Sequence, residues 1–243
     1  MISQARMVSV KALSIPEAWT SLNEAVVSCR ACPRLVAWRE EVARVKRRAY
    51  RDWDYWGRPV PGFGDPDARL LVVGLAPGAH GANRTGRMFT GDGSGVWLIQ
   101  ALHRAGFANQ PIALHRDDGL RLNDAYITAV VRCAPPQNRP TAQEIANCRP
   151  FLRHELALLS RIQVVIALGH IAFDGYLAAV REMGYELPRL QFRHGVHYSL
   201  PDGLPHLIAS YHPSRQNTQT GRLTEAMLDA VFRQARELLD GVH

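Results

Sequence analysis

Residues 74–95 read GLAPGAHGANRTGRMFTGDGSG, a glycine-rich stretch around which the rest of the chain can be interpreted. The apolar run Leu70–Val73 precedes it and a helical pattern beginning at Val96 follows it. The pattern therefore predicts one long loop between a strand and a helix. Its glycines allow the backbone to approach a ligand closely, and open α/β sheets bind ligands where strands end. On glycine content alone, a mobile surface loop is the alternative.

The stretch does not match the common phosphate-binding motifs. Residues 86–92 (GRMFTGD) lack the Lys and the Ser or Thr of a nucleotide P-loop. Gly91, Gly93 and Gly95 do not have the spacing of a dinucleotide fingerprint. The loop therefore predicts a ligand-binding site but does not indicate that the ligand is a nucleotide.

Four short apolar runs predict strands, at residues 69–74, 125–131, 164–168 and 206–210. Short apolar strands separated by helices are typical of a mostly parallel sheet with helices on both faces. Polar residues follow the strand ends, among them Asn138, His170 and His212. Because parallel strands end at one edge of a sheet, we expect these residues and the glycine-rich loop to meet there.

Capping signals place several helices. Ser94 is expected to cap the helix after the glycine-rich loop, and Thr224 the last, amphipathic helix. Thr141 is expected to open a short helix that ends at Cys148, and Pro150 to begin another.

Length and charge limit the possible functions. The 243 residues fit a single domain, 1–243, that includes a helical segment over residues 14–48. Lys and Arg number 29 against 22 Asp and Glu, a net charge of +7 that favours a polyanionic partner such as nucleic acid. Arg39, Arg44, Lys46, Arg47 and Arg48 make the second helical stretch basic, for which a solvated face is the alternative.

The sequence contains no targeting signal that we recognise. Met1 to Lys11 carries charges and no sustained apolar stretch, unlike a signal peptide. No apolar run approaches the length of a membrane-spanning helix. We therefore expect a cytoplasmic protein without membrane association.

The four cysteines form two pairs, Cys29-x2-Cys32 and Cys133-x14-Cys148, each beside a proline or a helix boundary. In a reducing compartment, such a group predicts one metal site with four thiolate ligands. Zinc and an iron–sulfur cluster both accept four cysteines, and the spacing does not choose between them. Buried free cysteines are the alternative.

Three residues at the expected edge suit chemistry on a planar ligand. Phe89 could stack on such a ligand or fill the core. Asp92, between two glycines, could act as a base or bond the adjacent amides of a turn. His212 could donate to developing negative charge or be satisfied by the backbone.

Four features of the sequence are specific when taken together: residues 74–78 (GLAPG), residues 84–92 (RTGRMFTGD), the spacing of the cysteines and residues 211–218 (YHPSRQNT). In these features the chain resembles the family 5 uracil-DNA glycosylases of prokaryotes. The resemblance covers nearly the whole chain after about Ser28. It implies a three-layer α/β/α sandwich with a four-stranded parallel sheet, a pocket for a flipped base at the edge of the sheet, and a [4Fe–4S] cluster. The cluster would be held by Cys29, Cys32, Cys133 and Cys148 and would join segment 14–48 to the sheet.

Two positions depart from other members of the superfamily. Leu75 stands where many relatives have an acidic or amide residue that positions water, and Ala129 where relatives have an asparagine that reads uracil. Both departures resemble the family 5 pattern. They move the general base elsewhere, to which we assign Asp92, and they loosen base recognition. His212 is then expected to stabilise the departing base.

Further site residues follow from the same resemblance. The base would be bound by the backbone N–H groups of Gly78 and Ala79 and by stacking on Phe89. Asn138 is expected to be a catalytic residue that supplies an adaptable polar contact from the side. Arg215 is expected to enter the gap in the DNA or to grip phosphates. Residues 215–222 with Arg84 and Arg87 are expected to contact the DNA backbone.

The expected function is removal of uracil from DNA, with other deaminated bases such as hypoxanthine and xanthine, by a monomeric enzyme that leaves an abasic site. One rival is an iron–sulfur nucleic-acid-binding or sensor protein without hydrolytic activity. Another is a nucleotide-processing enzyme with a four-cysteine zinc site. Asp92 and His212 at one edge favour the glycosylase, because a protein that only binds needs neither.

Overall fold

The computed structural model describes residues 14–241. The stretch from Met1 to Lys11, which the sequence analysis distinguished from a signal peptide, lies outside them. None of the helices between residues 14 and 241 combines the length and apolar character needed to cross a lipid bilayer.

Six strands form one sheet in the order β1-β3-β2-β4-β6-β5. The four inner strands are parallel: β2 (Leu70–Gly74), β3 (Ala125–Ala129), β4 (Val164–Leu168) and β6 (His206–Ser210). Two short strands pair antiparallel at the edges: β1 (Phe63–Gly64) and β5 (His197–Tyr198). The parallel core is confirmed, and the expected total of four strands is wrong because strands of two residues show no periodicity.

The helices alternate with these strands. They are α1 (Ile15–Ser28), α2 (Pro33–Val45), α3 (Ala82–Thr85), α4 (Gly93–Arg104), α5 (Ala142–Leu158), α6 (His170–Glu182), α7 (Arg215–Gln219) and α8 (Glu225–Asp240). Two 3₁₀ turns complete the described elements, η1 (Arg48–Tyr50) and η2 (Pro136–Asn138).

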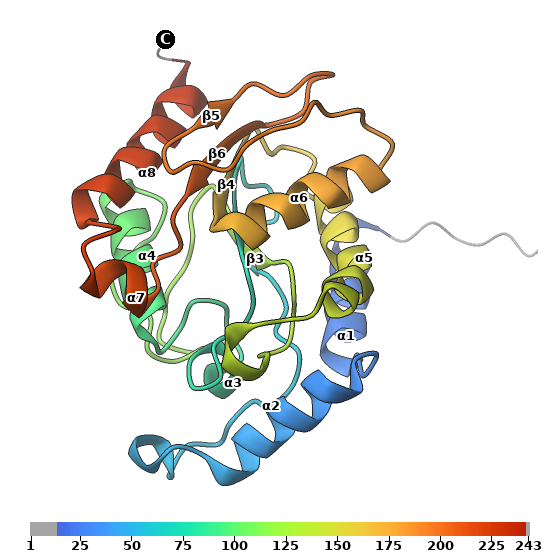
Figure 1. Cartoon of the computed structure of the whole chain (residues 1–243), viewed down its shortest axis with the longest axis vertical. Helices are drawn as coiled ribbons and strands as arrows, with labels where there is room; N and C mark the ends of the chain where they lie inside the picture. The colour runs from blue at the N-terminus through green and yellow to red at the C-terminus, as the bar shows by residue number, and fades with distance from the viewer. Residues whose placement is uncertain (1–13, 242–243) are drawn as a thin grey trace, which may run out of the picture.

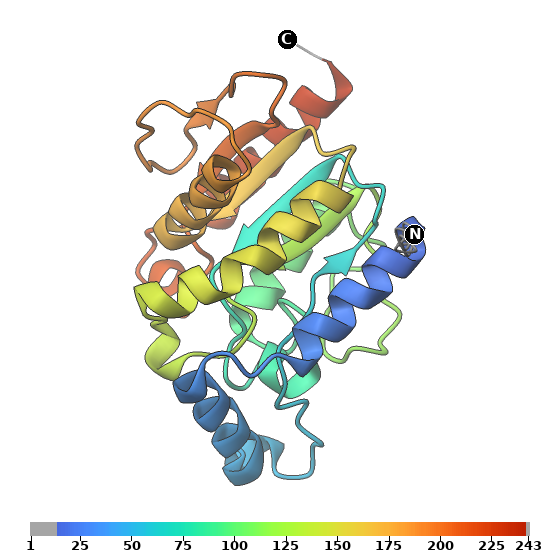
Figure 2. The ribbon, with the colours of Figure 1, turned by 90° about the vertical axis from the view of Figure 1, so that its right-hand side faces the viewer.

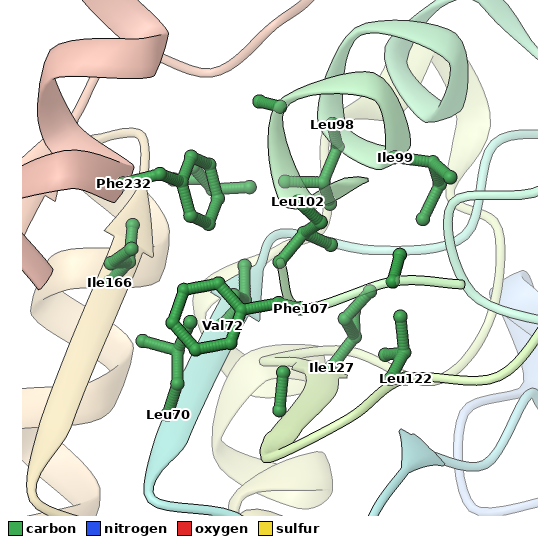
Figure 3. Packing of buried hydrophobic residues seen from close by; sticks show 14 of the residues in the cluster. Leu70, Val72, Leu98, Ile99, Leu102, Phe107, Leu122, Ile127, Ile166 and Phe232 are labelled. Atoms are coloured by element: carbon green, nitrogen blue, oxygen red, sulfur yellow. The ribbon is translucent and has the colours of Figure 1, made fainter. Parts of the chain in front are cut away.

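Helices cover both faces of the sheet, as expected for an α/β/α sandwich (Figures 1 and 2). Helices α4 and α8 pack together on one face, while α5 and α6 pack together on the other, with α1 against α5. Alternate residues of β2 point to opposite faces, because Leu70 and Val72 lie in one apolar cluster and Leu71 and Val73 in the other. Figure 3 shows the first cluster, in which Phe107 and aromatic and aliphatic residues of α4 and α8 cover β2, β3 and β4.

Three predictions about these elements are wrong in detail. Helix α5 continues through Pro150 instead of ending at Cys148, because its packing against α1 and α6 outweighs the hydrogen bond that proline cannot make. Strand β3 ends at Ala129, two residues before the predicted Val131. Helix α4 is capped by Asp92 and not by Ser94.

The glycine-rich stretch joins β2 to α4 as predicted, and it contains the short helix α3. The amino-terminal segment 14–48 contacts the sheet-bearing part through α1 against α5 and α2 against α3, among other contacts. This arrangement brings the turn between α1 and α2 near the connection from β3 to α5 (Figure 2).

Candidate active site and cysteine cavity

The glycine-rich loop forms a tight turn where β2 ends. The carbonyl oxygen of Gly78 accepts from the backbone N–H groups of Gly81 (3.2 Å) and Asn83 (3.0 Å). Within residues 14–241, the N–H groups of Gly78 and Ala79 have no hydrogen-bond acceptor. Both donors are therefore available to a carbonyl oxygen of a ligand, and their role in binding a base stays a prediction.

Asp92 lies at the amino end of α4 and faces this turn. Its Oδ1 accepts from Gly95 N at 2.9 Å and caps the helix. A Cβ atom would lie only 1.9 Å from Asp92 Oδ2 if built on Gly81, and 2.7 Å if built on Gly78. The two glycines thus leave room for the carboxylate, which is both a cap and a candidate base.

The environment of Asp92 favours proton uptake. Burial raises the pKa of its carboxyl above the ordinary value. The backbone N–H groups of Gly95 and Ser94 lower this pKa, but burial has the larger effect. A raised pKa suits a base that must take or hold a proton near neutral pH.

Phe89 lies across the end of the sheet beside His212. Its ring approaches Gly74 so closely that a Cβ there would lie 2.8 Å from the ring. The centroids of the Phe89 and His212 rings are 5.9 Å apart, with 30° between their planes. Phe89 also has a φ of 48°, an uncommon conformation for a bulky residue and one that the packing of this loop must hold in place.

His212 follows β6 in a turn fixed by hydrogen bonds. Its carbonyl oxygen accepts from Asn217 Nδ2 at 2.8 Å, and its Cβ lies 3.4 Å from the position of a Cβ on Gly169, at the end of β4. Burial lowers the pKa of His212 to about 4, so the imidazole is neutral at pH 7. A neutral imidazole still carries one N–H donor for an anion.

This burial predicts a share of the protein's sensitivity to acid. The unfolded imidazole has a pKa of about 6.5, above its folded value, so the unfolded state binds more protons between these values and stability falls as pH falls. His212→Asn should therefore lose about 1–2 kcal/mol less stability than the wild type between pH 7 and pH 5. Urea unfolding at both pH values measures this difference. Equal losses in the two proteins would contradict it.

Three other predicted residues lie at different distances from this group. Ala129 is buried at the end of β3, paired in register with Gly74, in the apolar cluster against which Phe89 packs. Arg215 begins α7 on the surface, with its Cγ 3.7 Å from the position of a Cβ on Gly93, beside Asp92. Asn138 is exposed in η2 with a φ of 57°. Its role stays a prediction, because no contact among the described residues joins its side chain to Asp92 or His212.

The expectation that Arg84 and Arg87 contact DNA is wrong, because both side chains are buried. Arg84 donates to the carbonyl oxygens of His80 and Gly91, and its guanidinium lies between the rings of two aromatic residues. Arg87 donates to Thr90 and pairs with Asp118. In the sequence, Arg84 and Arg87 are simply basic residues of a loop. Only their partners in the folded structure show that both arginines stabilise that loop.

Arg39 does not lie on a solvated basic face of α2, as its sequence context suggested. Its side chain is 2% exposed, and its Nη1 donates to Cys133 Sγ at 3.0 Å. Leu35, Arg39 and Val42 recur at helical spacing and are all buried, so the buried face of α2 was visible in the sequence.

The four cysteines all line one cavity, closed by the turn between α1 and α2, by α2 itself and by the connection from β3 to α5. All four are free thiols. Three donors face the sulfurs: Arg39 Nη1 on Cys133, Arg132 N on Cys148 (3.3 Å) and Asn147 Nδ2 on Cys32 (3.5 Å). Apolar residues supply much of the remaining lining: Leu35, Val36, Pro59 and Phe151.

The chemistry of this cavity suits ligation better than thiol catalysis. Burial raises the pKa of Cys148 to about 12 and also raises that of Cys133, so neither is a ready nucleophile. The thiols surround the cavity, and between residues 14 and 241 no three His, Cys, Asp or Glu side chains lie close enough together to hold a metal ion. Four sulfurs with N–H groups directed at them are a donor set that fits a metal ion or an iron–sulfur cluster.

Comparison with known proteins agrees with this geometry. The profile described as UDG, Uracil DNA glycosylase superfamily, matches residues 61–236. A Type-5 uracil-DNA glycosylase of Thermus thermophilus is 55% identical over 215 residues, 88% of this chain and 95% of the relative. Another of Mycobacterium leprae is 55% identical over 233 residues, 96% of this chain and 99% of the relative.

A Type-4 uracil-DNA glycosylase of Pyrobaculum aerophilum is less similar, with 32% identity over 62% of this chain and 60% of the relative. The profile match over residues 61–236 includes the glycine-rich loop, Asp92 and His212. The chain therefore belongs to the uracil DNA glycosylase superfamily and, within it, to the type-5 uracil-DNA glycosylases.

Proposed function

We propose that this protein hydrolyses the N-glycosidic bond of uracil in DNA and leaves an abasic site. The observation that carries the proposal is that Asp92 faces Gly78 and Gly81 in the turn with the free N–H groups, while His212 lies beside Phe89, whose ring covers the end of β2. A buried carboxylate, a neutral imidazole and unpaired backbone donors beside an aromatic ring suit a flipped base and its departure.

The base must first leave the duplex, which costs a few kcal/mol and least in a mismatch such as G·U. Phe89 then stacks on it, and the N–H groups of Gly78 and Ala79 bind a carbonyl oxygen at its edge. Arg215, exposed beside α4, grips a phosphate next to the gap.

Cleavage separates a base anion from a cationic sugar. The neutral His212 donates its N–H to the departing base, whose negative charge grows as the bond breaks. The Asp92 carboxylate holds the attacking water, accepts its proton and offsets the charge on the sugar. The His212 imidazole is neutral before the reaction, so it does not neutralise the negative charge of the Asp92 carboxylate.

The cysteine cavity is the proposed site of a [4Fe–4S] cluster, held by Cys29, Cys32, Cys133 and Cys148. Four sulfurs around one cavity and the donors directed at them support this assignment. The cluster's contribution is a structural link between the α1–α2 turn and the sheet. Free thiols around it suit a reducing compartment, and we propose a cytoplasmic monomer.

We further propose that hypoxanthine and xanthine are substrates. Ala129, in the apolar cluster against which Phe89 packs, has no amide that would pair with uracil alone. All three bases carry a carbonyl oxygen introduced by deamination, which suits the N–H groups of Gly78 and Ala79. Cytosine and adenine present an amino donor there, which these N–H groups repel.

Ala129→Asn should narrow the substrate range. An amide paired with uracil leaves polar atoms unpaired against purines, at about 1–3 kcal/mol each. The rates on hypoxanthine and xanthine should fall about tenfold or more relative to uracil. Ala129→Val is the matched control, because it adds volume without the amide and should slow all three substrates alike.

The assay uses purified protein and oligonucleotides that each carry one uracil, hypoxanthine or xanthine, with alkaline cleavage of the abasic product. Rates are compared between the wild type and both variants. A wild type active on uracil alone would refute the wider range and leave uracil removal in place. A wild type that binds these DNAs but cleaves none of them would refute the enzyme.

A further inference from the structure

The segment after α2, residues 46–58, forms the outer support of the catalytic loop. The rings of Tyr50 and Trp53 lie on the Arg84 guanidinium, with their centroids 4.0 and 3.9 Å from its central carbon. Arg84 belongs to α3, and its Nη2 donates to the carbonyl oxygen of Gly91 at 2.8 Å. Through Arg84, the rings of this segment are therefore connected to Gly91, the residue before Asp92.

Hydrogen bonds fix the same segment to α3. The backbone N–H groups of Trp56 and Gly57 donate to the carbonyl oxygens of Arg84 (2.9 Å) and Asn83 (3.0 Å). The Tyr55 hydroxyl lies 3.1 Å from Nδ1 of His80, next to Ala79 in the catalytic loop. The segment is thus held beside the active site by backbone and side-chain contacts.

Exposed arginines cover the outside of this support. Arg47, Arg48, Arg51 and Arg58 are exposed, and none of them forms an ion pair within residues 14–241. By contrast, Arg30 in the turn before α2, and Arg34 and Arg44 in α2, each pair with a glutamate. The segment also contains two exposed aspartates, but neither pairs with these four arginines.

Such a group of unpaired guanidinium groups fits a polyanion, because each one can neutralise a phosphate and release a counterion. The aromatic rings do not offer a platform for bases. The Arg84 guanidinium already covers the rings of Tyr50 and Trp53. The central carbon of the Arg116 guanidinium lies 4.7 Å from the centroid of the Trp56 ring. Phosphates are therefore the part of DNA that this surface suits.

We propose that Arg47, Arg48 and Arg51 form a second DNA-contact surface that binds backbone phosphates beside the catalytic loop. This inference rests on the proposed function. In Figures 1 and 2, α3 lies between α7 and this segment. DNA held by Arg215 on one side and by these arginines on the other would pass over the pocket, with the flipped nucleotide between the two contacts.

The test is the salt dependence of binding to an undamaged duplex, which needs no cleavage. In the triple variant R47Q/R48Q/R51Q, the slope of log K against log salt should fall by about two to three units, because each phosphate contact contributes about 0.9. The matched control is R161Q/R189Q/R233Q, which removes the same charge from three exposed arginines outside this segment. The control should keep the wild-type slope.

The possible outcomes decide the proposal. An unchanged slope in the first triple variant, with an unchanged melting temperature, would overturn it, as would an equal fall in the control. A loss confined to single-stranded DNA would overturn it in favour of base stacking. A wild type that releases no uracil but shows the predicted slopes would refute the proposed function and leave this surface supported.

Discussion

Asp92→Asn should slow single-turnover removal of uracil by about 100-fold or more, the range expected when a general base is lost. The side chain retains its shape and its hydrogen bond to Gly95 N, because Asn caps a helix about as well as Asp. What it loses is the charge and basicity of the carboxylate facing Gly78 and Gly81. The melting temperature and the affinity for DNA should therefore change little.

The matched control is Ser94→Ala, two residues along the same turn. Ser94 is the residue that the sequence analysis expected to cap α4, and its hydroxyl makes no hydrogen bond with residues 14–241. Its removal should leave the rate within about threefold, below the smallest usual effect of a general base. If Asp92→Asn also stayed within threefold, the base would lie elsewhere.

The pH dependence of the rate separates a base from a mere cap. Burial raises the pKa of Asp92, so the acid limb of the wild-type profile should lie above the ordinary range of an aspartate. The residual activity of Asp92→Asn should lack this limb. A variant that kept the same limb would show that another group titrates there.

Cys148→Ala should remove the proposed cluster and lower the melting temperature by about 10 °C or more, as expected for the loss of a structural metal group. The wild type, purified without oxygen, should be brown and contain about four irons per chain. Iron analysis, visible absorbance and thermal unfolding measure these effects. Stoichiometric zinc without visible absorbance in the wild type would contradict the cluster.

A second variant separates the lost ligand from the lost volume. Ala172, buried in α6 on the same face of the sheet, can be changed to Gly, which also removes a buried group but no metal ligand. Ala172→Gly should keep its iron while it loses some stability. Cys148→Ala with full iron content would show that this thiol is not a ligand.

The sheet was predictable where the chain buries continuous apolar runs. Strands β4 and β6 begin and end at the predicted residues, because every position in β4 is buried and the flanking polar residues mark its ends. Strands β1 and β5 have two residues each and depend on their neighbours for pairing, so no local pattern reveals them.

The candidate site was predictable to the extent that topology determines it. Phe89 and His212 meet because the loops that hold them follow the carboxyl ends of parallel strands, and Asp92 faces the turn of the same glycine-rich loop. The environment of long cationic side chains was not predictable, since an exposed and a buried arginine have the same local sequence signals. Arg84 and Arg39 are buried and contact other parts of the protein, whereas the arginines of residues 47–58 are exposed.

The cap of α4 illustrates a second limit. Asp and Ser are both strong cap residues, and Asp92 and Ser94 are two positions apart around Gly93. Only the hydrogen bond from Gly95 N to Asp92 decides between them. This choice matters for function, because it fixes the carboxylate at the turn that contains Gly78.

The most direct test of this account is to measure, by mass spectrometry, the free base and the DNA strand after a single turnover on a duplex with one G·U pair. We predict one uracil released per uracil-containing strand, with the strand intact until alkali breaks it at the abasic site. Asp92→Asn at the same concentration should leave the uracil attached. A wild type that binds the duplex and releases no base would contradict the account.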